Sequence, residues 1–233
     1  MPSAGGWFRY WSPPNTKLPA QPVRQAERAH LRASGVEPII VDVFDASAIS
    51  RAIAAVQPDI VVHQLTDLPR GLDPSEMIEG TQRNARMRRE GDSKPRVCRA
   101  QIRRASACHQ SIAWMYAPGP EPHSETDPLA LQASGARATT VAGVAALEHL
   151  TVSSPPIEGV VLRYGHLYGP NTGTDVAGEP PSLHVDAAAK ACLLAIEKAH
   201  FGIYNIAEPS GYVSTEKAQR ELGFEPAFRL DPQ

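Results

Sequence analysis

Cysteine is scarce in this chain of 233 residues, which contains only Cys98, Cys108 and Cys192. An odd number of cysteines without C-x-x-C spacing argues against a disulfide framework and indicates a reduced, cytoplasmic compartment. The eight histidines form neither an H-x-x-x-H motif nor a cluster with cysteine. The sequence therefore predicts no metal site.

Long apolar runs and a charge imbalance are also missing. No stretch approaches the roughly 20 apolar residues that span a bilayer, and residues 1–11 contain no apolar core of signal-peptide length. The formal net charge is −2, so no global attraction to nucleic acid or to an anionic membrane is expected. We therefore expect neither a membrane nor a nucleic acid among its partners.

One segment departs from this balance of charge. Residues 83–104 hold nine Lys or Arg against two acidic residues, Glu90 and Asp92. A clustered positive segment of this kind can bind phosphate or RNA. It contains no interleaved aromatic residues for base stacking, so a solvated basic stretch is the favoured interpretation.

Residues 37–64 have the pattern of a strand, a helix and a second strand. Pro38–Phe44 is a short apolar run rich in β-branched residues, typical of a parallel strand buried on both faces. Asp45 or Ser47 can cap the helix that follows, and Ile60–His63 has the composition of a second buried strand. Parallel strands joined by a helix need a right-handed crossover. The predicted class is therefore α/β, a Rossmann-like parallel sheet with flanking helices.

The rest of the chain continues this alternation. Helices are expected over 25–34, 75–89, 137–150, 185–198 and 214–222, and strands over 159–162 and 202–206, with a further strand ending at Gln110-Ser111. Many of the 22 prolines lie in residues 1–25 and around Pro118–Pro128, which we expect to be loops or poorly ordered. We predict an irregular segment over 1–24, a Rossmann-like domain over 25–170 and a small C-terminal substrate region over 171–233.

Six segments of the chain follow one another in a familiar order. They are Asp42-Val43, His63-Gln64-Leu65, Gln110–Tyr116 (Gln-Ser-Ile-Ala-Trp-Met-Tyr), Arg163–Pro170 (Arg-Tyr-Gly-His-Leu-Tyr-Gly-Pro), His184-Val185-Asp186 and Tyr204-Asn205-Ile206. Their order and spacing resemble the NAD-dependent epimerase/dehydratase family of extended short-chain dehydrogenases/reductases over about residues 25–230. The resemblance implies a cofactor, NAD or NADP, at the carboxyl ends of the strands. It also implies a small-molecule substrate, such as a sugar nucleotide, that reacts by hydride transfer.

The same resemblance assigns roles to individual residues. It implies that one group of residues contacts the cofactor or its diphosphate and that a second group transfers the proton during catalysis. The first is Asp42, Val43, His63, Gln64, Leu65 and Arg163, and the second is Ser111 and Tyr116. Each has a structural alternative: a strand-end Ser can bond its own turn, a Tyr can pack as an amphipathic ring, and an Arg can pair with a nearby carboxylate.

Three departures from the family pattern affect the function. No G-x-x-G-x-x-G follows an opening strand, although those glycines let the backbone approach a pyrophosphate. Thr140 and Val144 stand where the family has its catalytic Tyr and Lys, and residues 91–109 lack the family's Ala/Leu-rich helix and Val-rich strand. We hypothesise that residues 1–23 and 92–109 are out of frame or degenerate, which reading the gene in its other two frames tests.

The sequence thus supports two functions of different classes. The first is an epimerase/dehydratase-like or reductase-like enzyme whose cofactor binding is impaired. The second is a non-catalytic Rossmann-fold binding or scaffold protein. The oligomeric state stays open.

Overall fold

Four parallel strands form the centre of the molecule. The computed structural model describes residues 29, 31–33, 35–42, 44–58, 60–69, 75–91, 106–153, 159–198 and 201–230. The sheet has the order β1-β2-β3-β6, with strands β1 (Ile60–His63), β2 (Ser106–Ile112), β3 (Gly159–Tyr164) and β6 (Gly202–Ile206). All three pairings are parallel, so the predicted α/β class with a Rossmann-like parallel sheet is confirmed.

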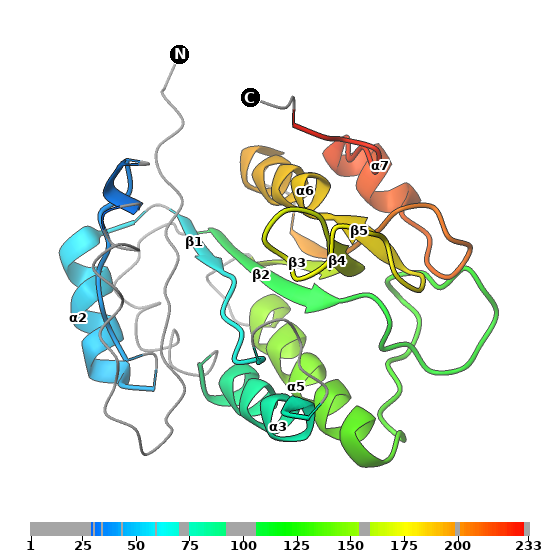
Figure 1. Ribbon diagram of the computed structural model, residues 1–233, viewed down its shortest axis with the longest axis horizontal. Helices are drawn as coiled ribbons and strands as arrows, with labels where there is room; N and C mark the ends of the chain where they lie inside the picture. The colour runs from blue at the N-terminus through cyan, green and yellow to red at the C-terminus, as the bar shows by residue number, and fades with distance from the viewer. Residues whose placement is uncertain are drawn as a thin grey trace.

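Helices cover both faces of this sheet (Figure 1). Helices α3 (Met77–Arg86) and α5 (Gly135–Val152) lie on one face, and α6 (Val185–Lys198) and α7 (Glu216–Leu222) lie on the other. A core packs between the strands and α6 and α7, including Leu162, Tyr204 and Leu222. Every residue of β3 is buried, as expected for a strand that has helices on both sides.

A second, two-stranded parallel sheet follows the end of β3. It pairs β4 (His166–Tyr168) with β5 (Ser182–His184). Gly165, the single residue between β3 and β4, lies so close to this pair that an added Cβ would stand 2.8 Å from the Ser182 backbone. The turn therefore needs glycine, and it directs β4 away from the main sheet.

The predicted strand Pro38–Phe44 is wrong. The described residues 36–42 form no strand, and the side chain of Ile40 is 51% exposed. A strand is stable only when a neighbour satisfies its backbone groups. Within the described residues, β1 pairs with β2 alone, so the predicted strand and its crossover to β1 have no partner there.

A second correction concerns the stretch 91–109, for which we expected no family-like strand. Strand β2 begins at Ser106, and Cys108 and His109 are buried opposite Val62 and His63 of β1. Residues 92–105 and 1–28 lie outside the described residues, so the frame hypothesis stays a prediction for those two stretches.

The predicted helices agree more closely with the structure. Helix α2 (Ala46–Val56) begins at Asp45, whose carboxylate accepts the backbone N–H groups of Ser47 and Ala48. Helix α3 continues into a π-helical turn, Met87–Gly91. Helix α7 ends at Gly223, which has the left-handed φ of 69° expected of a C-terminal glycine.

The expected helix over 25–34 and the domain boundaries are less fully covered. Of that helix, only residues 29 and 31–33 are described, and they are helical. The boundaries at 24/25 and 170/171 stay predictions. Strand β6 lies beyond residue 170 and pairs with β3 in the main sheet.

Two further observations concern partners. Across the described residues, no helix combines the length and the hydrophobicity that a membrane span requires. In the same part of the chain, no three His, Cys, Asp or Glu side chains gather where they could hold a metal ion.

Candidate functional site

The carboxyl ends of the four parallel strands lie along one edge of the sheet. At this edge Ser111 of β2 stands opposite Arg163 of β3, and Arg163 stands opposite Asn205 of β6. Successive side chains of a strand alternate between faces, so these three register partners form one row on the face that α5 covers. All three are buried. Ligands of open α/β sheets bind just beyond this edge, which makes the row the floor of the candidate site.

Glu148 of α5 neutralises Arg163 within this row. Arg163 donates from Nε to Oε1 of Glu148 at 2.8 Å and from Nη2 to Oε2 at 2.6 Å. The Ser111 hydroxyl donates to the same Oε1 at 2.7 Å. Burial works against the charge, but the hydrogen bonds and charge of Glu148 raise the pKa of Arg163. Arg163 is therefore a permanent cation held by a buried two-point ion pair.

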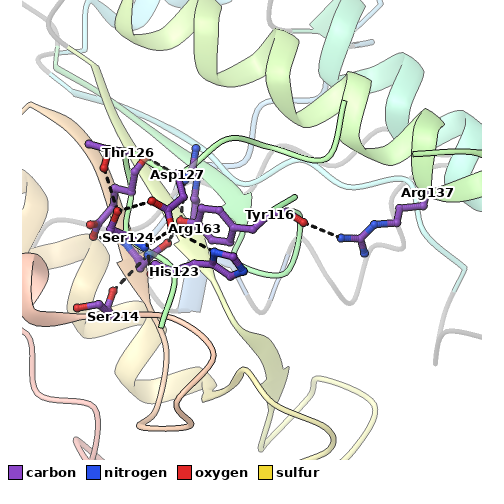
Figure 2. A network of polar contacts seen from close by, with 10 residues as sticks. Tyr116, His123, Ser124, Thr126, Asp127, Arg137, Arg163 and Ser214 are labelled. Carbon is purple, nitrogen blue, oxygen red and sulfur yellow. Dashed lines mark hydrogen bonds and ion pairs between the residues drawn. The ribbon is translucent and has the colours of Figure 1, made fainter. Parts of the chain in front are cut away.

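Tyr116 extends the same network toward β6. Its hydroxyl accepts a hydrogen bond from Nη1 of Arg163 at 2.7 Å and donates to Oδ1 of Asn205 at 2.6 Å. Burial raises the pKa of Tyr116, while the charge and hydrogen bond of Arg163 oppose that shift. The Tyr116 backbone carbonyl accepts a hydrogen bond from Arg137 at 3.1 Å, as Figure 2 shows.

The loop after Tyr116 packs a second set of polar groups against this phenol (Figure 2). The His123 ring stacks on the Tyr116 ring with centroids 4.8 Å apart, and its Nδ1 lies 3.1 Å from Asp127 Oδ2. Hydrogen bonds from His123 and Ser124 lower the pKa of Asp127. This proline-rich loop, expected to be a loop or poorly ordered, is thus a described loop held by local hydrogen bonds.

Helix α5 carries no acid or base at positions 140 and 144, where the family pattern has its catalytic Tyr and Lys. The Thr140 hydroxyl donates to the Ala136 carbonyl of its own helix at 3.1 Å. Val144 is fully buried in an apolar cluster with Ile112 and Met115. Neither side chain can supply a proton to a ligand, so any proton chemistry beside this helix needs another group.

Apart from Arg163 on β3, the described residues that are predicted to contact a cofactor are Asp42, ahead of α2, and His63, Gln64 and Leu65 at the end of β1. His63 ends that strand, and burial, with a smaller contribution from the charge of Arg88, lowers its pKa to about 4. Gln64 is exposed, although its side chain reaches the Tyr164 hydroxyl, and Leu65 is half-buried. The carboxylate of the exposed Asp42 accepts the backbone N–H of Phe44 at 2.8 Å.

The structure thus brings some of the predicted site residues together. His63, Ser111 and Arg163 lie on neighbouring strands and point to one face of the sheet, with His63 opposite His109, two residues before Ser111. Asp42 lies in a turn outside the sheet, and Val43 lies outside the described residues. The roles of these residues stay predictions, because the hydroxyls of Ser111 and Tyr116 and the guanidinium of Arg163 bond to protein groups.

Sequence reasoning missed three members of the network: Glu148, His123 and Asn205. In the sequence, Glu148 is one acidic residue of an Ala-rich helix, with nothing to mark it as the partner of Arg163. Asn205 offered one signal, because a polar residue inside a buried strand needs a hydrogen-bond partner. His123 offered none beyond its place in a proline-rich loop.

Comparison with known proteins identifies one relative in sequence. No family model matches the chain. A protein described as a 3-diazoavenalumate denitrifying reductase, from a Streptomyces species, is 38% identical over 211 residues. The match covers 80% of this chain and 66% of the relative, so the chain spans just under two thirds of that protein's length.

Solved structures share the fold at low sequence identity. A UDP-glucose 4-epimerase from Thermotoga maritima, solved with UDP-glucose, is 16% identical with a TM-score of 0.65, covering 84% of this chain and 81% of that one. A dTDP-glucose 4,6-dehydratase from Streptomyces venezuelae, solved with NAD, is 16% identical with a TM-score of 0.65 and covers 87% and 79%. A UDP-glucose 4-epimerase from Thermus thermophilus, in complex with NAD, is 22% identical with a TM-score of 0.56 over 82% and 71%.

Proposed function

We propose that the chain is a reductase-like member of the NAD-dependent epimerase/dehydratase family, whose fold it shares. It would reduce a small-molecule acceptor with NADH or NADPH. The relative described as a denitrifying reductase supports a reduction rather than an epimerisation. The predicted sugar-nucleotide substrate is less favoured, because Thr140 and Val144 of α5 supply neither an acid nor a base.

The main support for a reduction of this kind is that neither Thr140 nor Val144 can act as an acid or a base. Interconverting sugar hydroxyls and ketones moves a proton at the reacting oxygen, and this needs a positioned acid or base. Thr140 bonds its own helix and Val144 is apolar and buried. Reductive loss of dinitrogen from an arenediazonium avoids that requirement: one hydride adds, the carbon–nitrogen bond breaks, and neutral N2 leaves without a proton from the protein.

The cofactor would lie along the carboxyl edge of the sheet on the side of β1. The exposed Gln64 and the half-buried Leu65 follow β1 at this edge, and the exposed Asp42 has a carboxylate that could accept from a ribose or an adenine amine. These donors and acceptors fit a dinucleotide. When bound, NAD(P)H supplies the hydride. The chain's own part is to exclude water with Ile112, Met115 and Val144 and to fix the floor through the Arg163 network.

Binding of this cofactor is proposed to be weak. The sequence has no G-x-x-G-x-x-G to bind the cofactor's pyrophosphate. Each charge-assisted hydrogen bond that is lost in this way weakens binding by roughly 1.5–3 kcal/mol. We would titrate the purified chain with NADPH and NADH and follow nicotinamide fluorescence. A saturable Kd of about 100 μM or tighter supports the enzyme, and Gln64→Ala should weaken it while the exposed Gln82→Ala on α3 should not.

Turnover separates a reductase from an epimerase. With 4-carboxybenzenediazonium as the acceptor, we expect NADPH to be consumed in step with N2 release, above the rate without protein. UDP-glucose should consume no NADPH and should not change. Conversion of UDP-glucose to its epimer without net consumption of cofactor would instead establish the sugar-nucleotide reading.

A non-catalytic scaffold is the second candidate. It is favoured by one observation: Ser111, Tyr116 and Arg163 all direct their polar groups at protein atoms rather than outward. In that case neither nicotinamide cofactor would bind at millimolar concentration, and no acceptor would be reduced.

A further inference from the structure

Two aromatic side chains that the network does not use stand together beyond the carboxyl edge of the sheet. Trp114 lies two residues after the end of β2, and His166 opens β4, two residues after the end of β3. Their rings stack with centroids 3.7 Å apart and planes 20° from parallel. The pair therefore spans the two loops that leave the centre of the sheet, which is where an α/β fold binds its ligand.

The two rings differ in what covers them. Trp114 is half-buried and packs against the apolar cluster of Ile112, Met115 and Val144. His166 is exposed. Among the described residues, no hydrogen bond reaches the His166 imidazole, while the backbone N–H of this residue donates to the Pro181 carbonyl at 2.7 Å. The stack thus has a fixed apolar base and an open ring on its outer side.

We propose that the Trp114–His166 stack is the recognition wall of the substrate site, and that it selects a planar conjugated ring. This rests on the proposed function and names its substrate class. A flat ring can continue the stack on the open side of His166, where offset aromatic pairs are favourable. A pyranose is not flat and needs many hydrogen-bond partners.

The polar groups nearby fit the same substrate class. The hydroxyls of Ser111, Tyr116 and Thr140 are all engaged by protein atoms, so they offer a sugar little. His166 is exposed on part of its surface only, and the partial burial of its ring lowers its pKa, against an opposing effect from the charge of Glu179. A neutral imidazole stacks on a ligand ring without desolvating a charge, and its N–H can donate to a substituent of that ring.

Fluorescence of Trp114 tests this directly. The chain has three tryptophans, so the double variant Trp7→Phe/Trp11→Phe leaves Trp114 as the sole indole. We would titrate this variant with 4-hydroxycinnamate, as a planar conjugated acid, and with UDP-glucose. Saturable quenching by 4-hydroxycinnamate that UDP-glucose neither causes nor reverses is the expected result. Quenching by UDP-glucose instead, or no response to either probe, overturns the proposal.

Variants of His166 sharpen the test. His166→Ala should weaken 4-hydroxycinnamate binding roughly two- to tenfold, the range that one aromatic contact supplies. His166→Phe retains a ring and should restore most of it, which a purely structural role for the imidazole would not. His149→Ala, an exposed histidine on α5, is the matched control and should bind like the parent. Equal affinity of the Ala and Phe variants at position 166 contradicts the stacking wall.

The outcomes also separate this inference from the proposed function. If nicotinamide fluorescence shows that NADPH binds but 4-hydroxycinnamate does not bind, the recognition wall is contradicted and the proposed reductase function is not. If 4-hydroxycinnamate binds but NADPH does not, the recognition wall is supported and the proposed reductase function is contradicted.

Discussion

At the scale of single residues, the buried pair Arg163–Glu148 determines how the floor of the site is built. Arg163 and Glu148 are 3% and 4% exposed and meet through two hydrogen bonds. Such a pair adds little net stability over apolar residues, but removing one partner leaves a buried charge without compensation. The pair therefore specifies which strand and helix meet, and its loss should be far costlier than its presence is favourable.

We expect Glu148→Ala to lower the free energy of unfolding by about 3–5 kcal/mol. The exposed Glu197→Ala on α6 is the control and should change it by less than about 0.5 kcal/mol. Urea denaturation measures both. The double variant Glu148→Leu/Arg163→Met should cost clearly less than the sum of its single changes, and simple additivity would argue against the coupling.

His63 should make the protein sensitive to acid. Its pKa falls from 6.5 in the unfolded chain to about 4 in the folded one, chiefly because burial disfavours the charged ring. Between these values the unfolded state binds more protons, so the stabilisation is complete above pH 6.5 and is lost as the pH falls through about 4. The shift corresponds to about 3 kcal/mol.

Unfolding in urea at several pH values between 4 and 7 tests this. His63→Gln should flatten the pH dependence of the unfolding free energy in that window relative to the parent. His149→Gln, on the surface of α5, should keep the parent's slope. An unchanged slope in His63→Gln would show that other groups dominate the acid response.

At the scale of elements, the crossing of α3 and α5 depends on one glycine. An added Cβ at Gly143 would stand 3.2 Å from Ala85 Cα and 3.4 Å from Ala85 Cβ. We expect Gly143→Leu to force the helices apart and to cost about 1–3 kcal/mol. Its neighbour Ala142 is exposed, so Ala142→Leu should be nearly neutral. Thermal unfolding of the two variants makes the comparison, and equal melting temperatures would mean that the crossing can relax.

The elements also show what the sequence can and cannot predict. Caps and local patterns identify the helices: Asp45 begins α2 and Gly223 ends α7 as their residue types indicate. The run at Pro38–Phe44 has an equally clear pattern but forms no strand, because strand formation depends on a neighbour that no local pattern reports. The site network fails in the same way. Tyr116 and Asn205 bond across 89 residues of sequence, a distance that periodicity cannot bridge.

At the scale of the whole molecule, the order of the segments predicted more than any one of them. The α/β sheet and the resemblance to the family followed from the succession of strand ends at His63, Ser111 and Arg163, which the structure places on neighbouring strands. What the order could not give is the direction of each polar group. The same residues that suggest a catalytic site in sequence hold the sheet and α5 together in space.

This polar network also affects how fast backbone amide hydrogens exchange with solvent. Because the ion pair and its neighbours tie β2, β3 and β6 to α5, amide hydrogens of the central strands should be released only when the entire domain opens. Strand β1, which pairs with β2 alone within the described residues, should release its own much sooner. In deuterated solvent, mass spectrometry of peptides covering 159–164 should lag behind those covering 60–63 by orders of magnitude, and Glu148→Ala should erase most of that delay.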